Sequence, residues 1–571
     1  MPGLYQDSST IAGPLHQNKA VSFKPSLERG DRLKLVAFMM VVLATSVSFV
    51  WYLLHTIVFS GFSLLVVLSV ALIVLLELIR VLQSLTLFLF AYVAKDPLPM
   101  VPQYGLRVAV LTTIVPSKEP FSLVLHTLQE MKKIETTPGS KVHVWLLDEG
   151  NDPAIRARCD AIGVRYFSRG GLQGWNTGAG MFRARTKHGN HNAWRRAHEH
   201  DYDVVAQMDP DHVPQPDFLT RTLGYFADPD VAFVVAPQVY GNLERSWIAR
   251  AAAFQAYVFH GVIQRGGNGM QAPLLIGTNH LYRTAAFRQI NGYQDSIIED
   301  HLTSMVMFGA TSSSGRPWKG VYTPDIIAIG EGPTSFTDYF NQQKRWAYGI
   351  WDIAAKSTRD CIRKMTKPQA TTFLMLQFFY PSVALAWLLS SMATLLFSFA
   401  MPAYQNVASV VVILWLYSIA SSLALFFWLR KFNLVEHERR SWGLGGMALL
   451  LMCIPVYVSA ALQAIARRPL TYAVTAKGSL TSPDTLRTFL PHMGWLAFNG
   501  LGLALVLMFG RNLAGANTLW IVEHMAICAA PIAMYGAYRF TASLRSATRA
   551  LPQLRRVMVA HNVGEELRNI S

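Results

Sequence analysis

Long apolar runs without ionisable residues lie toward both ends of the 571-residue chain. Near the amino terminus, residues 35–54 and 57–76 are each long enough to cross about 30 Å of hydrocarbon as a helix, and His55 and Thr56 would join them. After the central part of the chain we expect four further spans, over residues 373–400, 407–429, 488–510 and 518–538. The pattern therefore predicts three pairs of membrane helices.

Residues 441–466 form one more apolar segment, which differs from the others in its flanks. Lys and Arg clusters stand on both sides of it, so a crossing would leave one cluster outside, against the positive-inside rule. Gly443, Gly445, Gly446 and Pro455 also weaken it as a straight helix. We expect this segment to lie in the cytoplasmic interface of the membrane instead of crossing it.

Basic residues predict the orientation of the chain. Five Lys or Arg residues precede the first span within residues 19–34, and five Arg residues follow the last one within residues 539–556. The positive-inside rule then places both termini, and the region between the first two pairs of spans, in the cytoplasm. The first apolar run starts too late and is too long for a cleaved signal peptide. We therefore expect a multi-pass protein of the inner (cytoplasmic) membrane.

Composition and charge agree with this layout. Hydrophobic residues make up 51% of the chain and charged residues 15%, whereas soluble domains typically carry about 25% charged residues. The net charge of +16 could indicate nucleic acid, but the basic residues concentrate beside the predicted spans, where topology explains them. The four cysteines lie far apart, which excludes a zinc finger and a disulfide scaffold.

The central region has the composition of a globular domain, with strand and helix patterns in alternation. Four apolar runs have the length of buried strands: residues 108–115, 142–147, 204–208 and 231–235. Helical patterns such as residues 123–131 and 191–200 lie between them. This alternation predicts an α/β fold with a mainly parallel sheet.

Acidic residues follow two of these strands directly. Asp148 and Glu149 come after one, and Asp209 and Asp211 come after another. Ligands of open α/β sheets bind beyond the carboxyl ends of the strands. Neighbouring carboxylates repel each other unless a cation joins them, and such oxygen ligands suit Mg²⁺ or Mn²⁺ bound together with a diphosphate. The Asp-Pro-Asp sequence is equally good turn chemistry, so the pattern alone leaves both readings open.

Two later clusters also carry polar chemistry. Glu299 and Asp300 either begin a helix, where the dipole favours acids, or provide a general base for a sugar hydroxyl. Gln342, Arg345 and Trp346 fall at i, i+3 and i+4, on one face of a helix. There Arg can neutralise a diphosphate and Trp can face a sugar ring, although Arg and Trp also anchor interfacial helices.

Together, these motifs resemble those of the processive family 2 glycosyltransferases, and most closely those of the bacterial cellulose synthase catalytic subunit. Asp148 matches the first aspartate of the family, and residues 209–214 match its D-x-D-H-V-P. Glu299 and Asp300 match the last two letters of T-E-D, and residues 342–346 match Q-x-x-R-W.

A fifth motif is specific to cellulose synthases within the family. Residues 472–477, Tyr-Ala-Val-Thr-Ala-Lys, resemble the F-x-V-T-x-K gating loop. Three positions depart from the family's patterns: Ile298 replaces Thr, Glu149 replaces Asp and Tyr472 replaces Phe. The alternative for residues 472–477 is a short polar linker.

The resemblance implies a polytopic α-helical membrane protein with a cytoplasmic α/β domain of the GT-A type, the fold of nucleotide-diphospho-sugar transferases. Glu299 and Asp300 would be catalytic, with Asp300 as the general base. Gln342 and Trp346 would bind the acceptor. The donor would contact Asp148, Lys187, Asp209, Asp211, Arg345, Thr475 and Lys477, and of these Asp209 and Asp211 would hold Mg²⁺ or Mn²⁺.

The implied reaction is inverting transfer from a UDP-sugar, expected to be UDP-glucose, to a growing β-glucan with 1,4-, 1,3- or mixed linkage. The expected partners are the donor, the nascent polysaccharide, the bilayer and an accessory export or regulatory subunit, but no nucleic acid. About thirty residues follow the last predicted span, too few for a fused PilZ domain. A pore for the polymer could be lined by Trp387, Tyr417, Trp495, Asn499, Trp520, Glu523 and His524.

Three other functions remain open at this point. A non-processive enzyme that adds one sugar to a lipid carrier would use the same donor site, and a hyaluronan- or chitin-type synthase would share the catalytic domain. A transporter with a nucleotide-sensing domain is a more distant alternative. The expected organisation is 1–34 cytoplasmic segment, 35–94 two spans, 95–356 GT-A domain, 357–430 interfacial helix and two spans, 431–487 interfacial segment and gating loop, 488–538 two spans, and 539–571 basic cytoplasmic tail.

Overall fold

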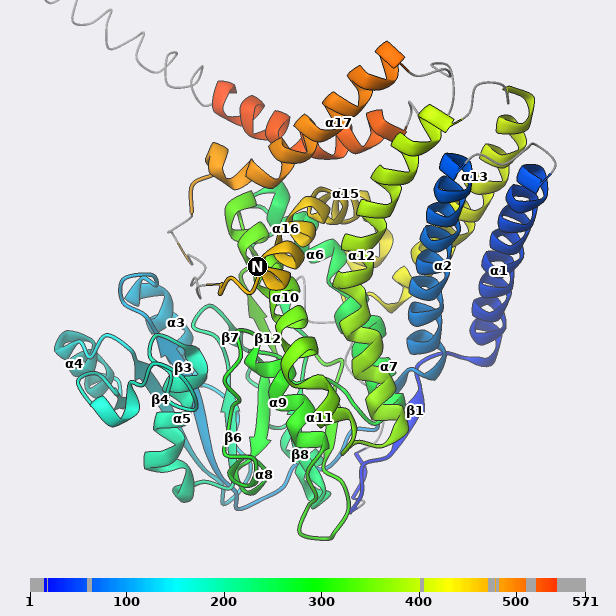
Figure 1. The fold of residues 1–571 in the computed structure, drawn as a ribbon. Helices are drawn as coiled ribbons and strands as arrows, with labels where there is room; N and C mark the ends of the chain where they lie inside the picture. Colours follow the sequence, from blue (N-terminus) through cyan, green and yellow to red (C-terminus); the bar gives the residue numbers. More distant parts are fainter. Residues whose placement is uncertain are drawn as a thin grey trace, which may run out of the picture.

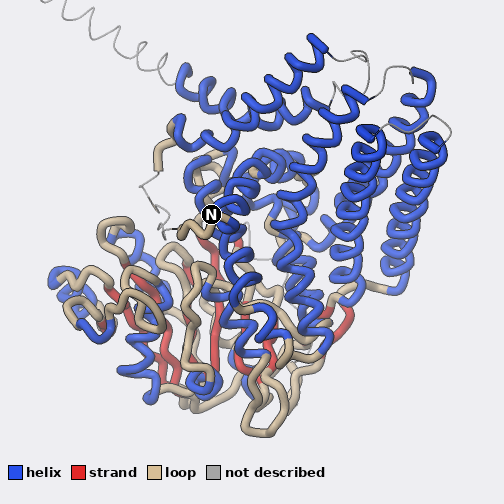
Figure 2. Tube along the Cα trace, viewed as in Figure 1, coloured by secondary structure: helices blue, strands red, loops and turns tan. Residues whose placement is uncertain are grey.

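The computed structural model describes residues 15–17, 19–58, 64–400, 405–470, 478, 482–509 and 520–541. Figure 1 shows an α/β domain and a set of long helices packed onto one end of it. Strands are confined to this domain and to a short ribbon at the base of the first two long helices (Figure 2).

The domain is built on a seven-stranded sheet of order β11-β8-β10-β6-β3-β4-β5. Its strands are β3 (Arg107–Ile114), β4 (Lys141–Asp148), β5 (Arg165–Phe167), β6 (Val204–Gln207), β8 (Val231–Val235), β10 (His280–Arg283) and β11 (Lys319–Tyr322). Neighbouring strands are parallel, except that β10 runs antiparallel to β6 and β8. β3, β4, β6 and β8 coincide with the four predicted strands. β10 was not predicted, because this strand has only four residues and is too polar to form an apolar run.

A smaller sheet and several helices complete the domain. Strands β7 (Val213–Pro214), β12 (Ala328–Gly330) and β9 (Val239–Tyr240) pair in that order. The helices are α3 (Phe121–Met131), α4 (Pro153–Ala161), α5 (Lys187–His198), α6 (Trp247–Gln255), α7 (Gln264–Gly269), α8 (Thr284–Gln289), α9 (Glu299–Phe308), α10 (Phe336–Lys356) and α11 (Thr358–Ile362).

The strands of the main sheet are buried on both faces. Side chains alternate along a strand, so Val108 and Val110 of β3 enter one core, and Ala109 and Leu111 enter the other. Helix α3 covers the first core and α5 covers the second. A sheet covered on both faces has near-continuous apolar strands, which is why the runs were readable in the sequence.

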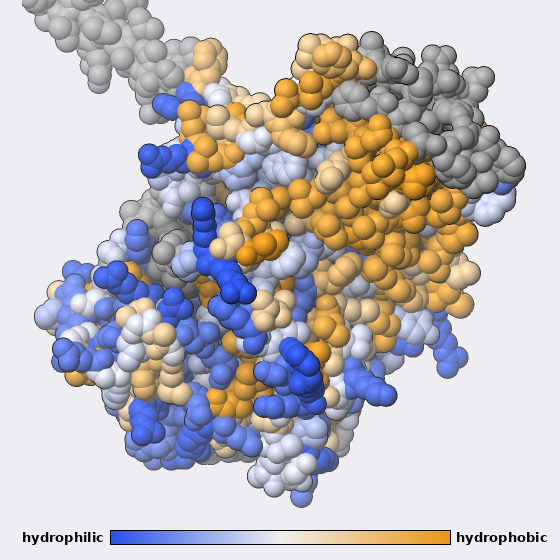
Figure 3. Space-filling model, viewed as in Figure 1, coloured by the Kyte–Doolittle hydropathy of each residue, from blue (hydrophilic) through white to orange (hydrophobic). Residues whose placement is uncertain are grey.

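Seven helices of the described residues are long and apolar enough to cross a membrane. They comprise α1 (Arg29–Val58), α2 (Leu64–Val93), α12 (Lys367–Ala400), α13 (Gln405–Trp428), the stretch Leu444–Ile465, α17 (Leu490–Phe509) and a last helix at Trp520–Thr541. Helices α1, α2, α12 and α13 run side by side (Figure 1). Apolar residues form a continuous band over them, whereas the α/β domain presents mainly hydrophilic residues (Figure 3). The chain is therefore a polytopic membrane protein.

The predicted limits of the second span, residues 57–76, were wrong. Helix α1 continues through the predicted linker to Val58, and α2 extends from Leu64 to Val93. The prediction ended at Glu77 and Arg80, because charges normally stop a span. Here Arg80 Nε donates to Glu77 Oε2 at 3.0 Å, and the guanidinium also reaches Ser418 and Ser422 of α13. The paired charges are thus accommodated inside the bundle.

The apolar stretch Leu444–Ile465 is divided into two short helices, α15 (Leu444–Met452) and α16 (Ile454–Ile465). At 1.5 Å per residue they are roughly 14 and 18 Å long, and each alone is shorter than the hydrocarbon core. Pro455 stands in the first turn of α16, just after the break. Helix α15 packs on α6, and α16 packs on α10 and α12. The interfacial placement expected from the flanking charges stays a prediction, because the stretch as a whole is also long and apolar enough to span.

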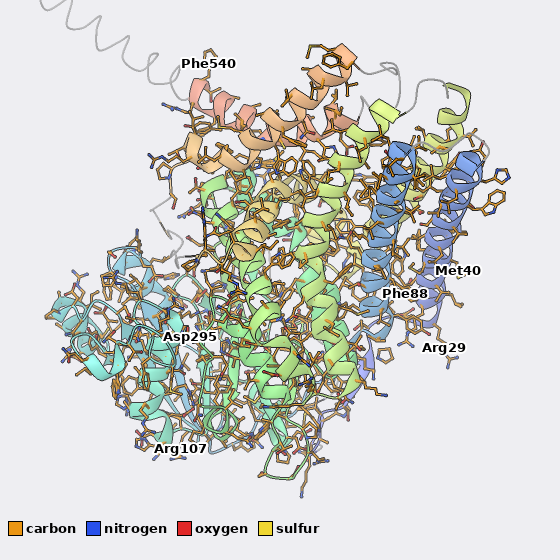
Figure 4. The ribbon with its side chains drawn as sticks, viewed as in Figure 1. Arg29, Met40, Phe88, Arg107, Asp295 and Phe540 are labelled. Atoms are coloured by element: carbon orange, nitrogen blue, oxygen red, sulfur yellow. The ribbon has the colours of Figure 1, made fainter. Side chains whose placement is uncertain are left out.

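The carboxyl ends of the parallel strands face the long helices. Arg107, the first residue of β3, lies at the end of the domain away from the bundle (Figure 4). The strands parallel to β3 share this direction. Strand β1 (Phe23–Pro25) pairs with β2 (Lys95–Pro97), which joins the base of the first two helices to the domain. Residues that follow the parallel strands are thereby carried toward the membrane part.

Candidate active site

A cavity of about 1370 Å³ extends from the carboxyl edge of the sheet into the long helices. Eight of the predicted site residues line it: Lys187, Asp209, Asp211, Glu299, Asp300, Gln342, Arg345 and Trp346. Four of the predicted pore residues line it as well: Trp387, Trp520, Glu523 and His524. Tyr417, Trp495 and Asn499 are not among its lining residues. The fold thus brings together Lys187 and three of the motifs, which are spread over more than a hundred residues.

Asp209 and Asp211 lie in the turn after β6. The Asp209 amide donates to the Thr278 hydroxyl at 2.9 Å, which fixes the turn against the loop before β10. Carboxylate oxygens of both aspartates and a ring nitrogen of His212 lie within 4.8 Å of one another. Asp211 and His212 are buried, while Asp209 is partly exposed. This set of two hard oxygen ligands and one imidazole fits a divalent cation such as Mg²⁺ or Mn²⁺.

Lys187 opens helix α5 beside these acids. Its ammonium contacts the Asp209 carboxylate and the Gly277 carbonyl. The helix is capped by Thr186, whose hydroxyl accepts from the Gly189 amide at 3.2 Å. Lys187 is therefore held at the edge of the cavity by a capped helix on one side and by the loop before β10 on the other.

Asp148, at the end of β4, is fully buried and does not line the cavity. Its carboxylate accepts from the amides of Gly150 and Asp152 and from the Tyr166 hydroxyl, each at 2.7 Å. These bonds shape the loop that follows the strand. Its contact with the nucleotide stays a prediction.

Glu149, the next residue, does line the cavity. Arg169, whose side chain is fully buried, donates to both of its carboxylate oxygens, at 2.7 and 3.0 Å. The same guanidinium donates to the carbonyls of Trp175, Phe182 and Arg183, at 3.0 to 3.1 Å. Arg169 thus organises the loop that leads into α5. The sequence reasoning missed it, because nothing distinguishes it locally from an exposed arginine.

Glu299 and Asp300 form the first turn of α9. Asp300 Oδ1 accepts from the His301 amide at 2.9 Å. Burial, together with the neighbouring Glu299 carboxylate, raises the pKa of Asp300 to about 7. Burial also raises the pKa of Glu299, while the Lys187 ammonium lowers it. An acid with a pKa close to neutrality is suited to accept a proton during catalysis.

Gln342, Arg345 and Trp346 lie on α10, which crosses from the domain toward the membrane helices. All three are partly buried and line the cavity. The helix is capped by Ser335, whose hydroxyl accepts from the Asp338 amide at 3.1 Å. The neighbouring Gln343 also lines the cavity and accepts from the Tyr457 hydroxyl of α16 at 2.8 Å. The divided apolar segment therefore braces this part of α10.

Thr475 and Lys477 of the predicted gating loop lie outside the described residues. Gly478, which follows them in the sequence, is described and lines the cavity. Its amide donates to Glu331 Oε2 at 2.9 Å, and its carbonyl accepts from Arg245.

Two family models match the chain over this region. One described as glycosyl transferase family 2 matches residues 112–290, and one described as glycosyl transferase family group 2 matches residues 204–429. Together they include most of the sheet, the acidic motifs, α10 and the helices α11, α12 and α13.

Curated relatives agree with the family models. The cellulose synthase catalytic subunit (UDP-forming) of Xanthomonas axonopodis pv. citri is 26% identical over 294 residues, 50% of this chain and 38% of that protein. The probable glucomannan 4-beta-mannosyltransferase 9 of Oryza sativa subsp. japonica is 29% identical over 230 residues, 38% of this chain and 41% of that protein. The chain thus spans about two fifths of the length of these relatives.

Among solved structures, the mannosyltransferase PcManGT from Pyrobaculum calidifontis aligns with 71% of this chain and with 100% of its own, at 15% identity and a TM-score of 0.47. Taken together, the family models, the mixed α/β sheet and the apolar helices describe a GT-A domain carried on membrane helices. Residues 112–429 of the chain thus match glycosyl transferase family 2 models, and the chain resembles the cellulose synthase catalytic subunits.

Proposed function

We propose that this protein is a processive, inverting glycosyltransferase that polymerises a β-glucan from UDP-glucose and moves the product across the inner membrane. The observation that supports this most is the shared cavity. One space of about 1370 Å³ is lined by the acids of the donor motifs and by Trp387, Trp415 and Trp520 of the membrane helices. A growing chain could therefore pass from the site of synthesis into the membrane without leaving the protein.

In the proposed reaction, Asp300 removes the proton from the acceptor hydroxyl as that oxygen attacks the anomeric carbon. Attack from the face opposite the diphosphate inverts the configuration of that carbon, so an α-linked donor gives a β-linked product. Glu299, next to Asp300 in the same wall, keeps the pKa of Asp300 high enough for it to hold the proton afterwards. Gln342 and Trp346 support the terminal sugar of the acceptor, with the indole facing the ring.

The donor diphosphate becomes the leaving group, and the cations of the site stabilise its charge. Arg345 and Lys187 line the cavity beside Asp209 and Asp211. Asp209 and Asp211 would hold Mg²⁺ or Mn²⁺, and the bound ion would supply further positive charge to the leaving group. Asp148 contacts the nucleotide, and Thr475 and Lys477 close over the donor.

Export follows from the surroundings of the same cavity. Sugar hydroxyls lose their water in hydrocarbon at a cost of several kcal/mol each, so a polysaccharide needs a lined path. The aromatic residues above offer flat apolar surfaces to the sugar rings, and Arg80, Glu523 and His524 add polar groups to the wall. With the domain and both termini in the cytoplasm, the path leads outward, where an accessory export subunit could receive the chain.

A second candidate is a β-1,4-mannan or glucomannan made from GDP-mannose. The probable glucomannan 4-beta-mannosyltransferases among the relatives favour it, since one of them is 29% identical over 230 residues. The residues that line the donor site carry no feature that separates glucose from mannose.

The test is synthesis by the purified full-length protein in lipid nanodiscs. It is supplied with radiolabelled UDP-glucose or GDP-mannose and with Mg²⁺ or Mn²⁺, and the product is sized and digested with linkage-specific glycanases. We expect a polymer from UDP-glucose that a β-glucanase degrades. Asp300→Asn should reduce synthesis by a factor of about 10² to 10⁴, because it removes the general base. A single sugar on lipid, or no transfer from either donor, would overturn the proposal.

A further inference from the structure

Lys187 lies where a cation bound by Asp209 would be expected. Its ammonium contacts the Asp209 carboxylate and also the Gly277 carbonyl, so two oxygens of the donor site already have a positive partner. The Lys187 and Asp209 side chains are 15% and 23% exposed, so water screens this pair only in part. A divalent ion that binds Asp209 has to replace this contact.

We propose that Lys187 competes with the divalent metal for Asp209, and that the nucleotide diphosphate releases this competition by giving the lysine a new partner. Metal and nucleotide would then bind cooperatively, and the metal alone would bind weakly. This inference rests on the donor site of the proposed function and goes beyond it, because it assigns an order to the loading of that site.

The position of Lys187 in the fold makes the exchange possible. It is the first residue of α5, where the helix dipole disfavours a cation, so its charge depends on neighbouring acids. Asp209 is one such acid, and the Glu299 carboxyl is near enough for Lys187 to lower its pKa. The backbone at this point is fixed, since Arg169 donates to the Thr186 carbonyl at 3.2 Å. The long side chain can therefore change partners while its helix stays in place.

An incoming diphosphate changes the balance of charge. If the metal binds without nucleotide, it takes Asp209 from Lys187. The ammonium then remains beside the positive end of α5 without this acidic partner. When a diphosphate arrives with the metal, its oxygens can accept from the displaced ammonium, and the helix end favours the same anion. The metal and the diphosphate therefore each lower the free energy that the other needs in order to bind. This is a positive coupling between the two binding sites.

The experiment measures Mn²⁺ binding directly, by the loss of the free-ion EPR signal, with the full-length protein in nanodiscs. Titrations are made with and without UDP for the wild type and for Lys187→Met. We expect Lys187→Met to bind Mn²⁺ alone roughly tenfold more tightly than the wild type, because Asp209 has lost its competitor. UDP should then tighten Mn²⁺ binding by a smaller factor in the variant than in the wild type.

Two further variants separate the contact from a general change in charge. Lys118→Met removes the same charge from the wall of the same cavity, and no ion pair to Lys118 is found within the described part of the chain. It should leave Mn²⁺ affinity nearly unchanged, and Lys187→Arg, which keeps the charge, should behave like the wild type. If Lys187→Met binds Mn²⁺ alone no better than the wild type, or no better than Lys118→Met, the proposal is wrong. Failure of every variant and of the wild type to bind UDP with Mn²⁺ would instead contradict the proposed donor site.

Discussion

At the residue scale, the adjacent acids Glu299 and Asp300 determine how the site responds to pH. Burial raises the pKa of both carboxyls, and the charge of Glu299 adds to the shift of Asp300. A general base works only when it is deprotonated, so activity should rise with pH through the pKa of Asp300, about 7. In the proposed mechanism, Asp300 moves the proton and Glu299 adjusts the proton affinity of Asp300.

Replacement of Glu299 by Gln should move the acidic limb of the pH profile to lower pH. The substitution removes a negative charge beside Asp300, which lowers the pKa of that carboxyl, and the base then stays deprotonated in more acidic buffer. The measurement is kcat/KM for sugar transfer as a function of pH. Asp295→Asn, which removes an exposed acid of the same domain that does not line the cavity, serves as the control. A limb that stays in place or moves upward would show that Glu299 does not act on Asp300 in this way.

Arg169 offers a second test at this scale, because its side chain is fully buried and bonded throughout. Arg169→Met leaves Glu149 and four loop carbonyls without their donor, which we expect to cost about 3 kcal/mol of unfolding free energy. Thermal unfolding of the detergent-solubilised protein measures the loss. The control is Arg156→Met, since Arg156 lies over the Tyr166 ring. This change should lower the unfolding free energy by well under half as much. Equal losses would contradict a central role for Arg169.

At the element scale, helix α12 of the membrane bundle braces the helix that carries the general base. Gln377 of α12 lies with its Nε2 3.3 Å from His301 Nε2, and its Oε1 accepts from the Thr358 hydroxyl at 2.8 Å. All three side chains are buried, and His301 follows Asp300 directly. A shift of α12 would therefore move His301, and with it the first turn of α9.

Gln377→Leu should lower kcat by several fold and the unfolding free energy by about 1 to 3 kcal/mol, with little change in KM for the donor. The matched control is Gln369→Leu on the same helix. Gln369 is also buried and hydrogen-bonded, to Gln271 and Thr366, but its bonds do not reach α9. It should lose similar stability while kcat stays unchanged, and equal effects of both variants on kcat would argue against the brace.

At the scale of the whole molecule, the bundle is assembled around an internal ion pair. Arg80 and Glu77 of α2 meet Ser418 and Ser422 of α13 and Ser46 of α1. Ionisable groups among membrane helices are costly unless they are paired. This cluster therefore joins three helices through one charge pair.

Arg80→Leu should destabilise the bundle strongly, by about 3 kcal/mol, because it leaves the Glu77 carboxylate buried without its cation. The double change Arg80→Leu with Glu77→Leu should recover much of the loss, because neither charge remains. Thermal unfolding in one detergent compares the three proteins. If the double variant is no more stable than Arg80→Leu, the pair itself is not the source of the stability.

The sequence predicts those parts of the architecture that depend on a local pattern of residues. The strands β3, β4, β6 and β8 were readable because they are apolar throughout, and the acids after β6 stood out because they follow such a run. The order of the motifs then implied one site, and the cavity brings eight of the residues together.

What could not be predicted depends on partners far away in the chain. The antiparallel strand β10 is polar at its ends, and it exists because β6 and β8 pair with it on both sides. Helix α2 passes through Glu77 and Arg80 because α13, more than three hundred residues later, supplies hydroxyls to them. The role of Arg169 could not be predicted, because it depends on loop carbonyls whose positions only the structure gives.

The direction in which the sheet faces the helices also affects how substrate is delivered. With its carboxyl edge against the bundle, the domain receives its donor in a narrow zone next to the lipid headgroups. Anionic leaflets have a surface potential of about −30 mV, which depletes a nucleotide diphosphate from that zone. Arg185 and Arg245, in the wall of the cavity, contribute positive charge that opposes this depletion. Lipid composition should thus control how fast the enzyme is supplied, independently of how fast it reacts.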